Sequence, residues 1–412
     1  MKYGLIGEKL SHSFSKEIHE SLGGYEYEIV EIPRDGLDAF MKKHDFTAIN
    51  VTIPYKEEVI PYLDFVSDRA REIGAVNTIV NKGGKLFGYN TDFSGMTDLI
   101  NSAGIEISGK KVLIAGTGGT SKTSYAVVRA LGAREIYKLS RSEKEGAITY
   151  GEAYEKHSDA EIIINTTPSG MFPNIDGLPI DPGRFPRLCG AIDAIYNPLR
   201  TKFIQKAESM GAAATGGLYM LVAQGVRASE IFLGKNYPEG ATDKIYNEIL
   251  KSKENIVLAG MPGCGKSTIG RLLAERLGRP FFDLDDEITK AEGKPITEIF
   301  AEGGESFFRD IESRVLRESL AHRSGAVIAT GGGAILRDEN VRLLKQNGRI
   351  YFLDRPIEQL MPTPDRPLAS SPEAIIKRYK ERFPRYCHVS DVHLKTDGIA
   401  EHAAEDIGKD FI

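Results

Sequence analysis

The chain has 412 residues, of which 41% are hydrophobic and 27% are charged, and its formal net charge is -5. This balance is typical of soluble globular proteins and gives no indication of a nucleic-acid partner, which usually requires a clustered basic surface. No apolar run approaches the ~20 residues that cross a bilayer, and at ~150 residues per domain the length predicts two or three domains.

Strand-like and helix-like segments alternate along the chain, which indicates α/β domains with mainly parallel sheets. Met1–Gly7 is too short in apolar length for a secretory signal, so we expect an opening strand there. Further strands of the first half are expected at Tyr25–Ile32, Ala48–Thr52, Lys111–Ala115, Glu135–Leu139, Glu161–Asn165 and Gly190–Ala194. Asn101–Gly109 has few large apolar residues and carries turn formers, so we expect an internal boundary there.

A glycine turn follows the expected strand Lys111–Ala115. It contains Gly116, Gly118 and Gly119 and fits the start of a dinucleotide-binding fingerprint, with Ser121 where Gly or Ala is usual. Glycines let the backbone approach a pyrophosphate, and the N-terminus of the next helix then faces the anion. Alone this signal is weak, because glycine-rich turns between a strand and a helix are common.

Ser140 and Arg141 follow the next expected strand. A carboxylate in this region would bind a ribose hydroxyl of the cofactor, whereas a guanidinium suits a 2′-phosphate. Arg141 therefore favours NADP over NAD, and a solvated surface cation is the alternative interpretation.

Seven polar motifs surround the glycine turn. In chain order they are His12-Ser-Phe-Ser15, Asn50-Val-Thr-Ile-Pro-Tyr-Lys56, Gly74-Ala-Val-Asn-Thr78, Gly88-Tyr-Asn-Thr-Asp92, Asn165-Thr-Thr-Pro-Ser-Gly-Met171, Asp193-Ala-Ile-Tyr-Asn-Pro198 and Gly217-Leu-Tyr-Met-Leu-Val-Ala-Gln224. Together they resemble shikimate dehydrogenase over about residues 1–250. The resemblance implies a two-lobed α/β reductase: residues 1–102, completed by about 215–250, would bind the substrate, and a Rossmann-like lobe at 103–214 would bind NADP(H).

The resemblance also implies roles for single residues. Lys56 and Asp92 would be catalytic, because a lysine beside a carboxylate can protonate the alkoxide made from a ring ketone. The implied substrate contacts are Ser13, Ser15, Thr52, Asn77 and Gln224, and the implied cofactor contacts are Gly116, Gly118, Gly119, Ser140, Arg141 and Thr166. Each substrate contact can instead be a cap or turn residue, and Ser15 is the clearest case because it precedes the expected helix Lys16–Leu22. Glu145 stands where the family often has a second basic residue that helps to hold the 2′-phosphate. Lys144, its neighbour, is the expected substitute.

The two halves meet at a short connection. Thr242–Lys251 has apolar residues at helical spacing, and the polar stretch Lys251–Glu254 leads into an expected strand, Asn255–Ala259. A linker this short favours a fixed arrangement over two freely tumbling modules. The three cysteines, Cys189, Cys264 and Cys387, are scattered along the chain. They indicate a reducing cytoplasm, and we expect neither disulfides nor a cysteine metal site.

The stretch Gly260-Met-Pro-Gly-Cys-Gly265-Lys266-Ser267 fits the P-loop pattern G-x-x-x-x-G-K-[ST]. It lies between the expected strand and an expected helix at Thr268–Leu277, which is the context that the motif requires. Backbone N–H groups and Lys266 would hold nucleotide phosphates, while Ser267 would reach Mg²⁺. A P-loop alone indicates phosphate binding rather than a kinase.

Five further motifs follow the P-loop. They are Asp283-Leu-Asp285, Phe308-Arg-Asp-Ile-Glu312, Gly331-Gly-Gly333, Asp365-Arg-Pro-Leu368 and Glu381-Arg-Phe-Pro-Arg-Tyr386. The set resembles shikimate kinase over about residues 254–412. The resemblance implies a P-loop α/β kinase domain with a parallel sheet and a mobile lid, which transfers the γ-phosphoryl group of MgATP to shikimate.

Here too the resemblance assigns roles. Asp283 and Ser267 would hold Mg²⁺, Asp285 and Lys266 would be catalytic, and Asp285 would also orient the attacking hydroxyl. The implied substrate contacts are Asp285, Arg309, Gly332 and Arg382, and the implied nucleotide contacts are Gly263, Gly265, Lys266, Ser267, Thr268 and the lid residue Arg366. Asp285 has the alternative interpretation of a helix N-cap before Glu287–Ala291, and Arg309 that of an intrahelical ion pair with Glu305 or Glu312.

The sequence thus predicts a cytoplasmic bifunctional enzyme with NADP(H), ATP and Mg²⁺ as cofactors. Its partners would be the small molecules 3-dehydroshikimate and shikimate, with neither nucleic acid nor membrane involved, and homo-oligomerisation is left open. One alternative is a non-catalytic sensor of shikimate or quinate. That class would lack residues such as Lys56, Lys266 or the arginines, all of which are present. The other alternative is that the first half also acts on quinate.

Overall fold

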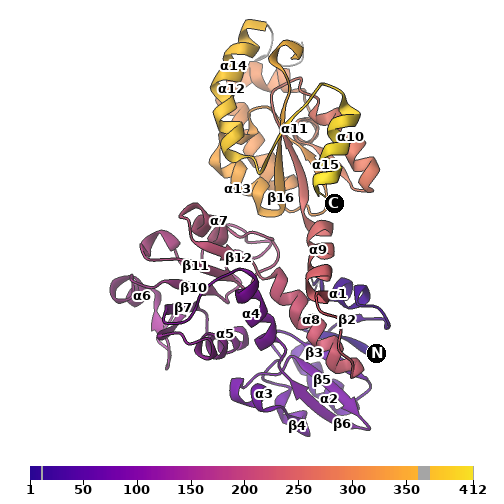
Figure 1. Cartoon of the computed structure of the whole chain (residues 1–412), viewed down its shortest axis with the longest axis vertical. Helices are drawn as coiled ribbons and strands as arrows, with labels where there is room; N and C mark the ends of the chain where they lie inside the picture. Colours follow the sequence, from indigo (N-terminus) through magenta and orange to yellow (C-terminus); the bar gives the residue numbers. More distant parts are fainter. Residues whose placement is uncertain (11–12, 361–371, 412) are drawn as a thin grey trace. The chain divides into compact units, whose positions relative to one another are not determined.

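The computed structural model describes residues 1–10, 13–360 and 372–411 (Figure 1). The chain forms two compact units, Met1–Ile249 and Leu250–Ile412. Strands and helices alternate in both, and the described part contains three sheets, so the expected α/β class is confirmed. Among the described residues, no helix is both long and apolar enough to span a membrane.

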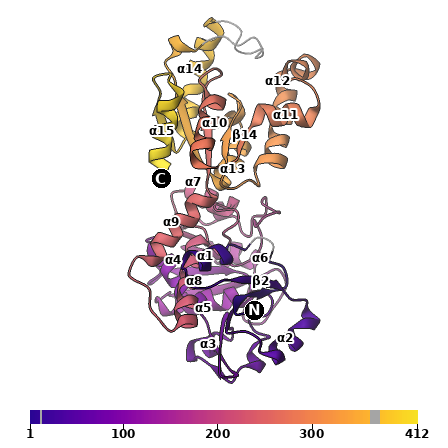
Figure 2. The same ribbon diagram turned by 90° about the vertical axis from the view of Figure 1, so that its right-hand side faces the viewer.

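The first sheet of unit 1 is mixed, in the order β2-β1-β3-β5-β6-β4. Its strands are β1 (Tyr3–Gly7), β2 (Glu28–Glu31), β3 (Ala48–Val51), β4 (Phe65–Val66), β5 (Thr78–Lys82) and β6 (Lys85–Tyr89). Helices α2 (Leu37–Lys43) and α3 (Asp68–Ile73) pack on one face, and α8 (Leu218–Leu233) packs on the other. Helix α1 (Ser15–Ser21) lies beside α8 (Figure 2).

The second sheet of unit 1 is parallel, in the order β9-β8-β7-β10-β11-β12. Its strands are β7 (Lys111–Ala115), β8 (Glu135–Ser140), β9 (Ile148–Thr149), β10 (Ile162–Asn165), β11 (Gly190–Asp193) and β12 (Ala213–Thr215). Alternate residues of β7 face opposite cores: Val112 and Ile114 pack with α4 (Asp92–Ser102) and α5 (Gly119–Ala130), and Leu113 packs with α6 (Tyr150–Lys156) and α7 (Lys202–Ser209). This strand order is that of a dinucleotide-binding fold, whose ligands bind outside the carboxyl ends of β7 and β10.

Unit 2 is built on a five-stranded parallel sheet in the order β14-β15-β13-β16-β17. Its strands are β13 (Asn255–Ala259), β14 (Phe281–Asp283), β15 (Val327–Ala329), β16 (Gly348–Asp354) and β17 (Val392–Lys395). Helices α10 (Lys266–Leu277) and α15 (Ala400–Phe411) lie together on one side, with α13 (Asp338–Asn347) and α14 (Pro372–Val389) on the other (Figure 1). Helices α11 (Leu284–Glu292) and α12 (Ile296–Val315) and the π-helical turn η4 (Leu316–Leu320) complete the unit.

The expected strands agree with the structure except at their ends. Lys111–Ala115 and Asn255–Ala259 are confirmed residue for residue, whereas the expected strand Tyr25–Ile32 shortens to Glu28–Glu31. The linker expected at Lys251–Glu254 was wrong in extent, because helix α9 (Ala241–Lys253) continues through most of it. Only Glu254 separates α9 from β13, and its N–H still bonds to the carbonyl of Leu250.

Candidate active sites

A buried ion pair lies where the two lobes of unit 1 meet. Lys56 follows β3, and Asp92 is the first residue of α4. Lys56 Nζ lies 2.6 Å from Asp92 Oδ2, and the two side chains are only 13% and 7% exposed. The carbonyl of Lys56 accepts a hydrogen bond from the N–H of Val76, which fixes the chain on which the lysine stands. Opposite charges in contact offset part of the desolvation that burial imposes on each of them.

Asn77 holds the start of α4 in place. Its Oδ1 accepts the N–H of Thr91 at 2.8 Å, and its Nδ2 donates to the hydroxyl of Thr91 at 3.0 Å. Asn50 supports this arrangement by donating from Nδ2 to the carbonyl of Asn77. Asn77 Nδ2 has a second hydrogen with which it could donate to a substrate, so its expected contact with substrate stays a prediction. Asn77 thereby positions Asp92, the next residue after Thr91.

Ser13 and Ser15 lie together, with the hydroxyl of Ser13 donating to Ser15 Oγ at 3.0 Å. The cap interpretation of Ser15 was wrong: α1 begins at Ser15, and Phe14 takes the N-cap position without a capping side-chain bond. Tyr196, for which we expected no role, joins this group. Its ring packs 5.1 Å from that of Phe14, and its hydroxyl bonds to Ser13. Burial raises the pKa of Tyr196, so the hydroxyl stays protonated and able to donate.

Helix α8 delivers Gln224 through a close contact with α4. Gln224 is 9% exposed, and its Nε2 donates to the carbonyl of Leu221 within α8. A Cβ on Gly95 would lie 2.8 Å from the carbonyl oxygen of Met220 and 3.0 Å from Cβ of Gln224. Glycine at position 95 therefore lets α4 and α8 approach closely, and it places Gln224 near the turn of α4 that carries Asp92. Thr52 is also an expected substrate contact. Its side chain makes no hydrogen bond to any residue that the structure describes.

The glycine turn lies directly beside Lys56. A Cβ on Gly119 would be 3.7 Å from Cδ of Lys56, and Lys122 of α5 pairs with Glu57 at 2.6 Å. Gly116 has a φ of +111°, and a Cβ there would collide with the hydroxyl of Thr166 at 2.6 Å. The glycine turn after β7 thus lies against the lysine that follows β3.

Two hydroxyl groups support the glycine turn, one of them from Ser121, which stands where the fingerprint usually has Gly or Ala. The hydroxyl of Ser121 donates to the carbonyl of Gly116 at 2.7 Å, and that of Thr166 donates to the carbonyl of Ala115 at 2.6 Å. Each hydroxyl ties the turn to an adjoining element. Gly118 precedes α5 as its N-cap.

The two basic residues after β8 differ in their contacts. Ser140 ends the strand, and Arg141 is exposed. Lys144 reaches back and donates from Nζ to the hydroxyl of Thr117 in the glycine turn at 3.1 Å. Lys144 therefore contacts the glycine turn, which makes it a second candidate for the 2′-phosphate contact predicted for Arg141.

The P-loop of unit 2 joins β13 to α10. Gly263 and Gly265 have φ angles of +80° and +98°, a conformation that glycine adopts without strain. Lys266 is 5% exposed, and its Nζ donates to the carbonyls of Gly260 and Met261 at 3.0 Å. The lysine therefore lies folded along its own loop.

Ser267 and Asp283 meet at the start of the next element. The hydroxyl of Ser267 donates to Asp283 Oδ2 at 2.5 Å, and Thr268 beside it is exposed. Asp283 is the N-cap residue of α11, and its Oδ1 accepts a hydrogen bond from the N–H of Asp285. The cap interpretation of Asp285 was therefore wrong, since Asp283 does the capping.

Two buried arginines, Arg309 of α12 and Arg382 of α14, are the expected contacts of the substrate carboxylate. Arg309 Nη1 lies 2.6 Å from Oε2 of Glu312, which confirms the intrahelical pair that the sequence offered as an alternative. Arg382 of α14 donates to the carbonyl of Gly332 at 3.1 Å. A Cβ on Gly333 would lie 2.2 Å from Nη2 of Arg309, so any larger residue there would displace the guanidinium group. Arg366, the expected lid residue, lies outside the described residues.

Burial shifts the protonation of these groups. It raises the pKa of Glu312, which Arg309 opposes, and it lowers the pKa of Arg382. Tyr386 is also buried, and its hydroxyl donates to the carbonyl of Gly332 at 2.5 Å. We expected no role for Tyr386, which is the last residue of the motif Glu381–Tyr386. The two arginines are held in a largely buried position, and guanidinium groups of this kind suit a carboxylate.

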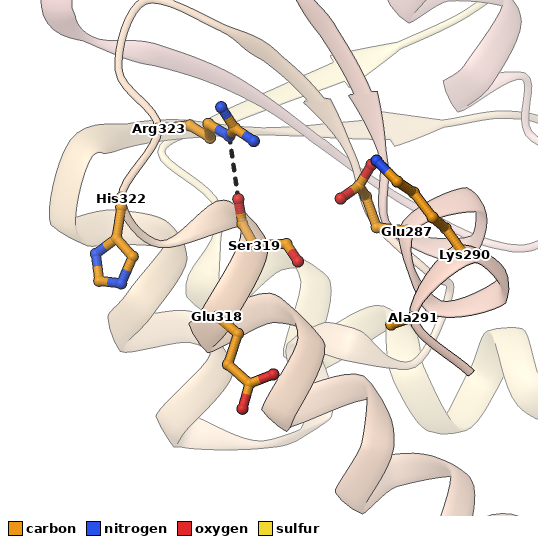
Figure 3. Close-up of a pocket in the computed structure, with 7 residues that line it drawn as sticks. All are labelled: Glu287, Lys290, Ala291, Glu318, Ser319, His322 and Arg323. Carbon is orange, nitrogen blue, oxygen red and sulfur yellow. Dashed lines mark hydrogen bonds between the residues drawn. The ribbon is translucent and has the colours of Figure 1, made fainter. Parts of the chain in front are cut away.

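A separate hollow of about 460 Å³ lies between α11 and η4 (Figure 3). It is lined by Glu287, Lys290, Ala291, Glu318, Ser319, His322 and Arg323. Arg323 Nε donates to the carbonyl of Ser319 across its rim. None of these residues belongs to the two candidate sites, and the lining mixes both signs of charge. Outside 11–12, 361–371 and 412, no three His, Cys, Asp or Glu side chains gather as metal ligands.

Comparison with known proteins decides the family. Residues 5–79 match the family model described as shikimate dehydrogenase substrate binding domain. The shikimate dehydrogenase (NADP(+)) of Clostridium beijerinckii is 37% identical over 262 residues, covering 60% of this chain and 96% of that protein. The chain belongs to the shikimate dehydrogenase family. The corresponding enzyme of Halothermothrix orenii is 39% identical over 264 residues, covering 56% of this chain and 90% of its own.

Solved structures of the dehydrogenase family agree. Shikimate dehydrogenase 1 from Peptoclostridium difficile has a TM-score of 0.57 at 37% identity, covering 60% of this chain and 98% of its own. Shikimate 5-dehydrogenase from Thermus thermophilus in complex with NADP(H) and shikimate has a TM-score of 0.54 at 29% identity, covering 60% and 99%. Residues 262–411 match the family model described as shikimate kinase. The chain therefore carries a shikimate dehydrogenase and a shikimate kinase, as the two sequence resemblances predicted.

Proposed function

We propose that the chain catalyses two consecutive reactions. Unit 1 reduces 3-dehydroshikimate to shikimate with NADPH, and unit 2 transfers the γ-phosphoryl group of ATP to shikimate, giving shikimate 3-phosphate. The observation that carries the proposal is the position of the buried Lys56–Asp92 pair against the glycine turn at Gly119. We assign 1–102 with about 215–250 to the substrate lobe, 103–214 to the cofactor lobe and 254–412 to the kinase.

In the reductase, bound NADPH would supply a hydride to the ketone carbon. The ammonium group of Lys56 donates a proton to the alkoxide oxygen, and Asp92 stabilises the lysine in its charged form before the transfer. Ser13 and Ser15 donate to the substrate carboxylate, while Thr52, Asn77 and Gln224 bind ring hydroxyls. The turn from Gly116 to Gly119 holds the pyrophosphate, and Arg141 with Lys144 holds the 2′-phosphate.

In the kinase, Lys266 leaves the carbonyls of its own loop for the phosphates of ATP. Ser267 and Asp283 would hold Mg²⁺, since a hydroxyl and a carboxylate are hard oxygen donors and already adjoin at 2.5 Å. Bound Mg²⁺ would neutralise charge on the phosphates. Asp285 orients the attacking hydroxyl, and Arg309 and Arg382 clamp the carboxylate of shikimate.

The two alternatives are weaker. A sensor has no need of a lysine buried against a carboxylate at the cofactor turn. Quinate dehydrogenase from Corynebacterium glutamicum shares the fold with a TM-score of 0.54, but at 24% identity.

The three cysteines form no disulfide, which fits the cytoplasm that we propose as the location.

Separate assays of the purified chain test the proposal. We expect NADPH oxidation that requires 3-dehydroshikimate, and ATP consumption that requires shikimate and Mg²⁺. Reduction of NADP⁺ by quinate at a rate equal to that with shikimate would favour the quinate alternative, and inactivity in both assays would favour the sensor.

A further inference from the structure

Glu305 faces Arg309 and Arg382, the two arginines that we call the carboxylate clamp. The proposed kinase mechanism assigns Glu305 no role. Oε1 of Glu305 lies 3.5 Å from Nη2 of Arg309 and 3.9 Å from Nη2 of Arg382. The two arginines belong to different helices, α12 and α14, so the contact is more than a pair within one helix. The carboxylate of Glu305 thus lies against the two guanidinium groups to which we assign the carboxylate of the substrate.

The charges of the clamp balance without a substrate. The two guanidiniums of Arg309 and Arg382 contact two carboxylates, those of Glu305 and Glu312. A substrate carboxylate would add a third anion among largely buried groups, where like charges repel strongly, and Asp285 adds a further negative charge close to Gly331. One carboxylate must therefore leave the clamp when the substrate enters.

Glu305 is the carboxylate that can leave. The side chain of Glu312 is 0% exposed and lies so close to Gly331 that a Cβ there would be 2.7 Å from its Oε1. The side chain of Glu305 is 43% exposed and can turn into water. Gly304, the residue before it, interrupts α12 with φ +72° and ψ -167°, and nothing lies within 4 Å of its Cβ position. The backbone before Glu305 therefore has both conformational freedom and space.

We propose that Glu305 is a built-in competitor for the carboxylate clamp, which holds the arginines neutralised until shikimate displaces it. The inference rests on the proposed kinase function. A simple anion gains only the two arginines when it expels Glu305, whereas shikimate also gains its hydroxyl contact with Asp285. Glu305 thus lowers the affinity of the clamp for every carboxylate that must displace it, and it raises the KM for shikimate.

Steady-state kinase rates of the full chain test this, with MgATP saturating and NADP⁺ omitted so that the dehydrogenase stays silent. We expect Glu305→Gln to lower the KM for shikimate about two- to fivefold, the range of a partly exposed ion pair, with kcat nearly unchanged. Acetate should become a stronger competitive inhibitor by a similar factor. Glu302→Gln is the matched control, because Glu302 lies one turn earlier on α12 and pairs with Lys294 instead; its KM should equal that of the wild type.

A KM that is unchanged or raised in Glu305→Gln overturns the proposal, because Glu305 would then orient the arginines rather than compete. Absence of shikimate phosphorylation in the wild type would contradict the proposed kinase function instead. If Glu305→Gln fails to fold, as judged by loss of dehydrogenase and kinase activity together, Glu305→Asp decides. Its shorter side chain keeps the charge but reaches the clamp poorly, so its KM should also fall, and a raised KM would overturn the proposal.

Discussion

At the scale of single residues, Lys56 carries the largest share of the proposed reduction. Its ammonium is the only proton donor to which we assign a place at the alkoxide. Replacing Lys56 by Ala should lower the rate of NADPH oxidation with 3-dehydroshikimate about 10²–10⁴-fold, because general acid–base groups contribute that much. Phosphorylation of supplied shikimate should stay near wild type. Lys266→Ala is the mirror-image control, with kinase activity lost and reduction kept. More than half of the wild-type reduction rate in Lys56→Ala would remove Lys56 from the mechanism.

The cofactor preference depends on two cations. Arg141 is exposed, while Lys144 already contacts Thr117 of the glycine turn. A charge-assisted hydrogen bond to the 2′-phosphate contributes about 1.5–3 kcal/mol, so Arg141→Ala should lower the ratio of kcat/KM for NADPH over NADH by roughly tenfold to a hundredfold. The same ratio measured for Lys144→Ala provides the comparison. A ratio that changes only in Lys144→Ala would assign the phosphate contact to the lysine.

Asp193 predicts a pH dependence of stability. It is fully buried, and it accepts bonds from Asn165, Thr201 and the N–H of Ile195 at 2.9, 2.7 and 3.0 Å. Burial raises its pKa from 3.8 to about 7. Because the folded pKa is the higher one, the folded state binds the proton more tightly, and this contribution to stability is lost as the pH rises from about 4 through 7.

We therefore expect the urea midpoint of unit 1 to fall between pH 5 and pH 8 by more in the wild type than in Asp193→Asn. The amide carries no charge and can be accommodated if the hydroxyl of Thr201 reverses its bond. The shift of the pKa from 3.8 to about 7 corresponds to about 4 kcal/mol at most, and it already includes the opposing effect of the three donors. Equal pH dependence in both proteins would show that Asp193 is ionised throughout.

At the scale of elements, the contact between α4 and α8 determines where Gln224 lies. Gly95→Ala should push the helices apart, since its Cβ would meet Met220 and Gln224 within 3.0 Å. Overpacking of this kind destabilises by about 1–3 kcal/mol. The KM for 3-dehydroshikimate should rise while kinase rates stay the same. Asn101→Ala, an exposed position of the same helix, should change neither. A Gly95→Ala variant with wild-type KM would remove Gln224 from substrate binding.

The elements also show what a sequence can predict. The strands Lys111–Ala115 and Asn255–Ala259 were found residue for residue, because each is a fully buried apolar run that ends at a glycine turn. Tyr25 and Tyr27 have strand-like composition, yet their rings pack against His19 instead of extending β2. Packing of this kind joins distant segments, and periodicity does not reveal it.

The candidate sites follow the same division. Motifs placed Lys56 with Asp92 and Ser267 with Asp283, because each motif follows a strand whose position in the sheet the fold dictates. The position of a helix cap depends on backbone angles, which a sequence does not show. The sequence therefore allowed Asp285 as the N-cap of α11, whereas Asp283 holds that position. The approach of Glu305 to Arg382 joins α12 to α14, and nothing in the local pattern around either residue announces it.

At the scale of the whole molecule, two sheets each carry a glycine turn at the carboxyl end of a central parallel strand, β7 in unit 1 and β13 in unit 2. Backbone amides and helix N-termini at such turns suit phosphate groups, which explains how one chain can use two nucleotides. Helix α9 runs across the boundary between the units at Ile249 and Leu250. The central claim is that the product of the first unit is the substrate of the second.

One coupled reaction tests that claim most directly. The purified chain receives 3-dehydroshikimate, NADPH and MgATP, and NADPH loss and shikimate 3-phosphate are followed together. We expect one phosphate ester for each NADPH oxidised at completion, with shikimate accumulating in Lys266→Ala and no ester forming from 3-dehydroshikimate in Lys56→Ala. NADPH oxidation by the wild type without any shikimate 3-phosphate, or ester formation without NADPH, would contradict the account.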